Sequence, residues 1–169
     1  MELGIIASNW GEEPFAKAKA RGLSFLEYCV NVGSNFEDFE NASDAILDFS
    51  KKYGVKIGSI GRWGADKITP DGEIIEEELS LAYRYIDQCE KLGSPVYVTG
   101  CNYVDGLSFY QNITRAISFF QKVVAVSYTH LSSVSIHGPT GANVSNPLAL
   151  VHWPSRFCIS RSVTSFKQV

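Results

Sequence analysis

Short apolar runs alternate with longer segments of helical spacing along the first 124 residues, and this alternation limits the possible folds more than any other feature. The apolar runs cover residues 3–7, 23–30, 55–60 and 95–99. Such alternation is typical of βα units arranged around a parallel sheet. The sequence therefore predicts an α/β fold with four consecutive βα units.

The intervening segments carry the signals of helices. Glu12, Glu13 and Pro14 place acids and a proline in the first turn of one helix. Asn41 is expected to cap the next, whose buried face would be Ala42, Ala45, Ile46, Phe49 and Tyr53. A third helix is predicted over residues 71–92, with an apolar face of Ile75, Leu79, Ala82, Ile86 and Cys89. A fourth, from about residue 106, would bury Ile113, Ile117, Phe120 and Val124.

The composition changes after the fourth unit. All 18 acidic residues lie between Glu2 and Asp105, whereas residues 125–169 contain nine serines and no sustained helical period. We therefore divide the chain into an organised domain, 1–124, and an atypical tail, 125–169. The tail is either a natural extension with weak patterning or a non-native, out-of-frame segment.

Charge and hydropathy exclude several classes of partner. The formal net charge of −3 disfavours general binding to nucleic acid or to an anionic membrane. No run supplies the 18 or more apolar residues of a membrane span, and Glu2 stands where a secretory signal would be basic. The expected location is cytoplasmic.

Polar and aromatic residues follow the predicted strands, at residues 8–10, 27–28, 61–63 and 99–102. In parallel α/β folds, ligands bind at the carboxyl ends of the strands. No glycine-rich fingerprint of a dinucleotide or P-loop phosphate site occurs in the chain. A different small-molecule site is therefore expected at these strand ends.

Four segments carry a family resemblance: Leu3-Gly-Ile-Ile, Leu23-Ser-Phe-Leu-Glu27-Tyr, Gly61-Arg62-Trp63 before the long helix, and Pro95-Val-Tyr-Val-Thr-Gly100. Together they resemble the N-terminal half of the sugar phosphate isomerase/epimerase family, in the xylose-isomerase-like TIM barrel superfamily. The resemblance implies a (β/α)₈ barrel that acts on a small sugar or sugar phosphate. It also implies a divalent metal (Mn, Mg, Co or Zn) for metal-assisted proton transfer next to a sugar carbonyl.

The metal ligands of the resembled family come mainly from the fifth strand onward, so none can be assigned in this chain. The tail holds His130, His137 and His152 but no acid, which disfavours a metal site there. A complete barrel normally needs more than roughly 200 residues. We therefore expect a fold truncated to about four βα units plus an irregular tail, without activity as it stands; whether the chain is an enzyme stays open.

Glu27 is the candidate catalytic residue, because it matches an acidic position that the family places at the end of the second strand. A charged side chain within an apolar strand must be paired, or solvated at a site. The alternative is an exposed carboxylate at the start of a loop.

Five residues are candidates for substrate binding: Asn9, Trp10, Arg62, Trp63 and Asn102. Arg62 would hold a phosphate or carboxylate through its planar fork, or form a surface salt bridge. The two tryptophans would supply an apolar wall for a sugar or pack in the core. The two asparagines would bind a polyol or satisfy turns.

Two other functions stay open. A relative of the apurinic endonucleases would use a three-metal site and bind DNA, but that branch carries histidines near the third and fourth strand ends where this chain has none. A non-catalytic half-barrel would bind a ligand or pair with another chain. In any fold of only four βα units, the unpaired edges of the first and fourth strands would promote self-association.

Overall fold

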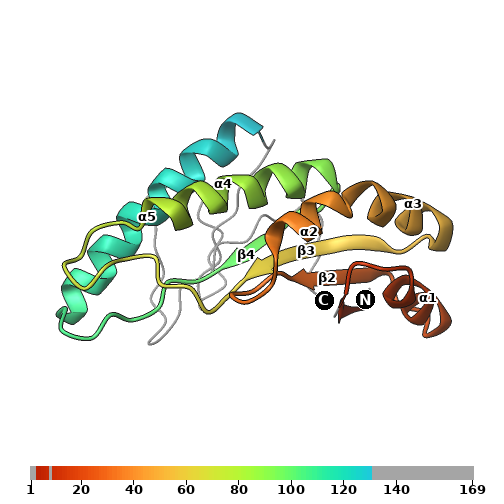
Figure 1. Cartoon of the computed structure of the whole chain (residues 1–169), viewed down its shortest axis with the longest axis horizontal. Helices are drawn as coiled ribbons and strands as arrows, with labels where there is room; N and C mark the ends of the chain where they lie inside the picture. Colours follow the sequence, from red (N-terminus) through yellow and green to blue (C-terminus); the bar gives the residue numbers. More distant parts are fainter. Residues whose placement is uncertain (1–2, 8, 131–169) are drawn as a thin grey trace, which may run out of the picture.

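The computed structural model describes residues 3–7 and 9–130 of the 169-residue chain (Figure 1). The strands are β1 (Gly4–Ala7), β2 (Phe25–Cys29), β3 (Lys56–Arg62) and β4 (Tyr97–Thr99). The helices are α1 (Glu13–Ala20), α2 (Phe36–Asn41), α3 (Ser43–Tyr53), α4 (Glu76–Lys91) and α5 (Phe109–His130). The predicted α/β fold with four consecutive βα units is confirmed.

The four strands form one parallel sheet in the order β1-β2-β3-β4, so each strand pairs with its neighbour in the sequence. The register between β2 and β3 shifts once, because Leu26 pairs with Ile57 while Glu27 pairs with Ser59. Gly58 is therefore an extra residue that bulges from β3. Within the described residues, β1 and β4 have a strand neighbour on one side only.

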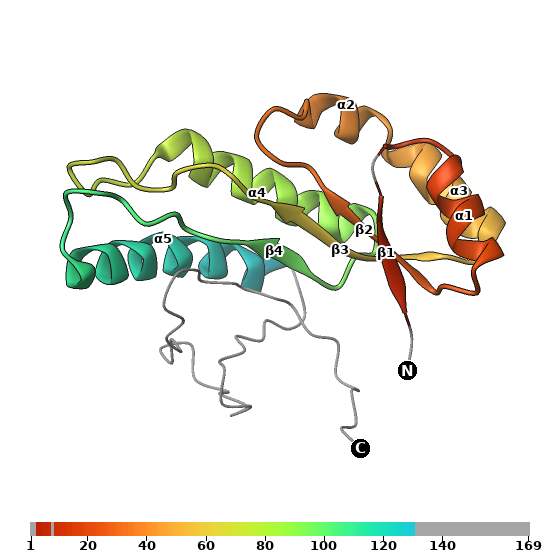
Figure 2. The same ribbon diagram turned by 90° about the horizontal axis from the view of Figure 1, so that it is seen from below.

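The two faces of the sheet differ in burial. Leu26, Tyr28 and Ile60 point toward the helices and are fully buried. On the opposite face, no described helix covers the sheet, and Ile6 of β1 is 64% exposed. Figures 1 and 2 show α1 beside α3 and α4 beside α5, and both pairs are in contact. We call the uncovered side of the sheet the open face.

The helix around residues 42–53 differs from its prediction at the N-terminus. Asn41 is the last residue of a separate helix, α2, and does not cap α3. Asn35 caps α2 instead, since its Oδ1 accepts a hydrogen bond of 3.0 Å from the backbone N–H of Glu37. Gly54 ends α3 with a left-handed φ of 64°, a conformation that glycine adopts without strain. Ala45, expected in the core, is exposed.

The two long helices begin later than predicted. Helix α4 starts at Glu76, because residues 69–73 form a turn in which Thr69 N–H donates to Glu73 O at 2.8 Å. Helix α5 starts at Phe109, after Ser108 and Gln111 bond each other's backbone N–H in a capping box. Helix α5 continues to His130, so residue 124, the expected end of the domain, lies inside it. Residues 131–169 lie outside the described part of the chain.

The core between sheet and helices contains most of the apolar side chains predicted for it. The α4 face is confirmed at Leu79, Ala82, Ile86 and Cys89. On α5, Phe120 and Val124 are buried as predicted, whereas Ile113 and Ile117 are only partly buried. Searched over its described residues, the chain has no helix of the length and apolarity that crossing a membrane requires.

Candidate functional site

The strongest candidate site lies on the open face at the carboxyl ends of β2 and β3. Glu27 is in β2, opposite Ser59 of β3, and its partly exposed side chain points away from the buried Tyr28. Cys29, two residues later on the same face, donates its S–H to Glu27 Oε1 at 3.7 Å. Burial and the Glu27 charge both raise the pKa of the Cys29 thiol, which favours the neutral donor over the thiolate.

Gly61 leaves a space between two polar groups on this face. A Cβ built on Gly61 would lie 3.6 Å from the indole Nε1 of Trp63 and 3.7 Å from Glu27 Oε1. A hydrogen-bond donor and a carboxylate therefore border the same small space, next to the backbone oxygen of Val98 on β4. This arrangement suits a ligand with hydroxyl groups, because a hydroxyl both donates and accepts hydrogen bonds. We call Glu27, Cys29, Gly61 and Trp63 the candidate site.

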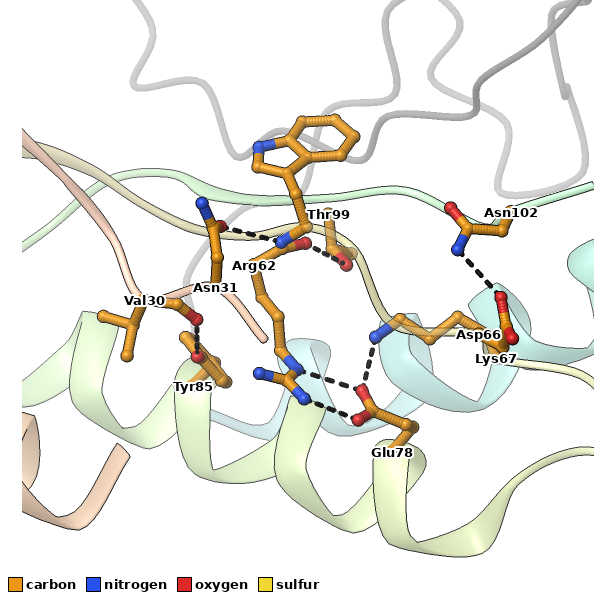
Figure 3. A network of polar contacts seen from close by, with 10 residues as sticks. Val30, Asn31, Arg62, Asp66, Lys67, Glu78, Tyr85, Thr99 and Asn102 are labelled. Atoms are coloured by element: carbon orange, nitrogen blue, oxygen red, sulfur yellow. Dashed lines mark hydrogen bonds and ion pairs between the residues drawn. The ribbon is translucent and has the colours of Figure 1, made fainter. Parts of the chain in front are cut away.

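The backbone of Trp63 is fixed from the end of β2. Its N–H donates to Asn31 Oδ1 at 3.0 Å, and its carbonyl oxygen accepts from the N–H of Val32 at 3.2 Å. Figure 3 shows Asn31 in this position beside Arg62. The chain then turns at Gly64, whose φ of 87° is strained for residues other than glycine.

Arg62 belongs to a buried ion-pair network on the helix side of the sheet (Figure 3). Its Nε and Nη2 donate to the carboxylate of Glu78 on α4 at 3.0 and 2.6 Å. Lys67, 1% exposed, donates from Nζ to the same carboxylate at 2.5 Å. The guanidinium is thus engaged away from the open face, and the geometry gives no support to the expectation that Arg62 holds a substrate anion.

The pKa values of this network follow from burial opposed by pairing. Desolvation would raise the pKa of Glu78, but the hydrogen bonds from Arg62 and Lys67 outweigh it and hold that pKa below its usual value. Desolvation lowers the pKa of Lys67 despite the attraction of Glu78. The Glu78 hydrogen bond raises the pKa of Arg62. Two cations therefore share one carboxylate in a largely buried place.

Further hydrogen bonds join the strand ends below the site (Figure 3). The Tyr85 hydroxyl of α4 donates to the carbonyl oxygen of Val30, and its ring lies 6.0 Å from the Arg62 guanidinium carbon. Thr99 Oγ1 donates to the carbonyl oxygen of Arg62 at 3.3 Å. The ends of β2, β3 and β4 are therefore held in one frame by side chains.

Three predicted binding residues lie apart from Glu27. Trp10 packs on the helix side of β2, with its ring 5.0 Å from Phe39 and 5.5 Å from Tyr28. Asn9 accepts a hydrogen bond of 3.0 Å from the N–H of Gly11, the geometry of a local turn. Asn102 is exposed and donates to Asp66 Oδ1 at 2.8 Å. Of the six predicted site residues, the structure brings together Glu27 and Trp63.

Five residues of this region were missed by sequence reasoning: Cys29, Asn31, Gly61, Lys67 and Glu78. Cys29 had a usable signal, since it lies two residues after Glu27 in a strand and therefore shares its face. Glu78 and Lys67 had none, because each reads as an ordinary charged residue until the loop after β3 is folded.

The described residues do not fit the divalent metal that the resemblance implies. No group of three or more His, Cys, Asp or Glu side chains within residues 3–7 and 9–130 is placed to hold a metal ion. Glu27 supplies one carboxylate and Cys29 a protonated thiol. A divalent ion takes four or more ligands, so the candidate site by itself is incomplete for one.

Comparison by sequence finds no family model that matches the chain. It finds no matching protein among curated sequences either.

Comparison of the structure finds sugar epimerases. D-psicose 3-epimerase from Clostridium cellulolyticum H10, solved with D-tagatose, matches with a TM-score of 0.62 and 13% identity over 76% of this chain and 49% of its own. D-allulose 3-epimerase from Methylomonas sp. matches with a TM-score of 0.61 and 16% identity, over 77% of this chain and 48% of its own. The 3-keto-D-glucoside 4-epimerase from E. coli matches with a TM-score of 0.59 and 14% identity, over 77% of this chain and 53% of its own.

At these identities the likeness concerns the fold. The chain spans about half the length of the solved structures it matches. Proteins with a xylose isomerase domain are among the other matches. The described part of this chain has an α/β fold like that of one half of a (β/α)₈ barrel.

Proposed function

We propose that these four βα units form one half of the barrel of a sugar isomerase or epimerase, and that the candidate site binds part of the sugar. The observation that carries the proposal is the pairing of the Glu27 carboxylate with the Trp63 indole N–H around Gly61, on the face that points into a barrel. The fold shared with three sugar epimerases supports the same class of ligand. The motifs quoted from the sequence support it independently.

The chemistry assigned to this half is binding and orientation. Glu27 would accept a hydrogen bond from a sugar hydroxyl, or take a proton next to the carbonyl if the bound sugar brings that carbon within reach. The Trp63 indole N–H would donate to an oxygen while its ring covers an apolar sugar face. The Cys29 thiol donates to Glu27 and helps to orient it. A divalent metal would supply the electrophile for a developing enediolate, but its ligands would have to come from outside the described residues.

The proposed ligand is an uncharged sugar. Glu27 places a negative charge on the open face, which repels a phosphate at close range. Arg62 and Lys67, the cations next to the end of β3, are both paired with Glu78 on the other side of the sheet. A phosphorylated sugar would therefore lack a cationic partner among these described residues.

Filling the space at Gly61 tests the proposal. In Gly61→Ala the new Cβ makes ordinary contacts at 3.6 to 3.7 Å, so the free energy of unfolding should change by less than about 1 kcal/mol. The methyl group would occupy the space between Glu27 and Trp63. We expect saturable binding of a ketose to the full chain, measured by calorimetry or ligand-observed NMR, to weaken at least about tenfold, or 1.4 kcal/mol.

Ser80→Ala, at an exposed position on α4, is the matched control and should leave binding unchanged. Absence of ketose binding to the parent chain would contradict the proposed function. Equal affinity of the parent and Gly61→Ala would move the ligand away from the candidate site.

We also propose that the 169-residue chain alone does not interconvert sugars. Mixing it with Mn²⁺, Mg²⁺ or Co²⁺ and a panel of ketoses should leave the sugar composition unchanged by chromatography, because the described residues lack a metal-ligand set. The control is one of the solved epimerases under the same conditions. Turnover above that of a metal-chelated sample would show that the active machinery is complete.

A second candidate function, a pairing module, is favoured by the uncovered sheet. Strands β1 and β4 have one described neighbour each, and Ile6 exposes 64% of its surface on the open face. Unpaired edges and apolar faces promote association. At tens of micromolar, light scattering is expected to give a mass above that of one chain. A monomer with a cooperative melt would contradict this candidate.

A further inference from the structure

The segment that carries Trp63 is tied at both ends to one carboxylate. Arg62, directly before Trp63, binds Glu78 through two hydrogen bonds of its planar fork. Lys67, four residues after Trp63, binds Glu78 Oε2 at 2.5 Å. Figure 3 shows both side chains converging on Glu78 from the two ends of this segment. Glu78 therefore contacts, from α4, both ends of a loop whose other side faces the candidate site.

Burial makes this network sensitive to the charge of Glu78. The exposed fractions of the Arg62, Lys67 and Glu78 side chains are 9%, 1% and 15%. Breaking a buried ion pair by removing one partner is strongly destabilising, because the remaining charge is left uncompensated. Here the removal of one negative charge would leave two buried cations, and the segment would have to rearrange to expose them to water.

Such a rearrangement would reach Trp63 directly. The Trp63 backbone is held by Asn31 and Val32 on the β2 side, so the Arg62 side chain supplies the adjoining restraint from the helix layer. We infer that Glu78 is a positioning residue: by holding Arg62 and Lys67 together it fixes the Trp63 indole over Gly61, beside Glu27. The inference deepens the proposed function and rests on it for the meaning of the site, although its test needs no sugar.

The test uses Trp63 as its own reporter. The chain contains three tryptophans, so Trp10→Phe and Trp153→Phe together leave Trp63 as the only one. In this background, Glu78→Gln should shift the Trp63 emission maximum to longer wavelength and raise its acrylamide quenching constant at least twofold. Measurement well below the melting temperature separates this change from global unfolding, which circular dichroism monitors in the same samples.

Glu77→Gln is the matched control, because Glu77 is the exposed neighbour of Glu78 on α4 and loses the same charge. It should leave the emission and quenching of Trp63 as in the parent. Lys67→Met is the second variant: it removes one tether and keeps the Arg62–Glu78 pair charge-balanced, so the fold should survive and quenching should rise by a smaller factor than in Glu78→Gln.

A folded Glu78→Gln protein with the parent's emission and quenching would overturn the inference, as would an equal change in Glu77→Gln. If Glu78→Gln does not fold, the Lys67→Met variant is the deciding measurement. Acrylamide quenching of Trp63 that is unchanged in Lys67→Met would overturn the inference. Loss of the fold in both variants assigns the network to stability alone and also overturns it. A different outcome is that the parent chain does not bind a ketose while Glu78→Gln still changes the Trp63 emission and quenching as expected. That outcome would contradict the proposed function and leave the positioning role of Glu78 intact.

Discussion

Replacing Phe39 by alanine is expected to lower the free energy of unfolding by about 3 to 5 kcal/mol, the range for truncating a buried aromatic side chain. Phe39 is fully buried, and its ring lies 5.0 Å from Trp10, 5.5 Å from Tyr28 and 6.1 Å from Phe36. The loss is a large fraction of the roughly 5 to 15 kcal/mol that stabilises an ordinary domain. Denaturant unfolding followed by circular dichroism measures it.

Tyr110→Ala is the control for this experiment. It removes an aromatic side chain that is 75% exposed, so it should change the free energy of unfolding by about 0.5 kcal/mol or less. Equal effects of the two substitutions would show that the aromatic cluster around Phe39 is not the core of the domain.

Replacing Glu27 by glutamine should reduce turnover more than tenfold in a closed barrel that contains these four units, on the order of 1.4 kcal/mol in the barrier. The amide keeps the size of the side chain but can neither take a proton nor offer a charged acceptor to a hydroxyl. Steady-state kinetics with a ketose substrate, together with a melting curve, measures the effect at constant fold.

Glu73→Gln supplies the comparison, since Glu73 is exposed in the loop before α4 and its side chain lies outside the candidate site. Its kinetics should match the parent's. Parent-like turnover of the Glu27 variant would assign that residue to the ordinary exposed carboxylates.

The fold was largely predictable because its signals are local. Strand runs, proline at the start of α1 and glycine after α3 act within a few residues of the structure they determine. Helix boundaries were less predictable where a turn or a tertiary contact competes with the helical hydrogen bonds that the local sequence favours. The 71–75 segment has helical spacing, yet a turn and the Ile68–Ile74 bridge hold it out of α4.

The site was predictable only where alternation along a strand survives. Glu27 lies on the open face, but the position of Arg62 depends on the bulge at Gly58. Ile57 of β3 pairs with Leu26 of β2, and both point toward the helices. Without the bulge, Arg62 would lie an odd number of residues after Ile57 and would therefore point to the opposite face, the same face as Glu27. The extra residue Gly58 turns Arg62 to the helix side of the sheet, where it binds Glu78 of α4.

The sequential order of the strands also has a consequence for how such a chain folds during synthesis. Every strand pairs with the one made just before it, so each βα unit can add to the growing sheet as it leaves the ribosome, without waiting for a distant segment. In a closed barrel the pairing of the first and last strands is the exception. Among the described strands, the outer edge of β1 gains no partner however many of these units have been added, so it is the sheet edge that stays exposed for longest during synthesis.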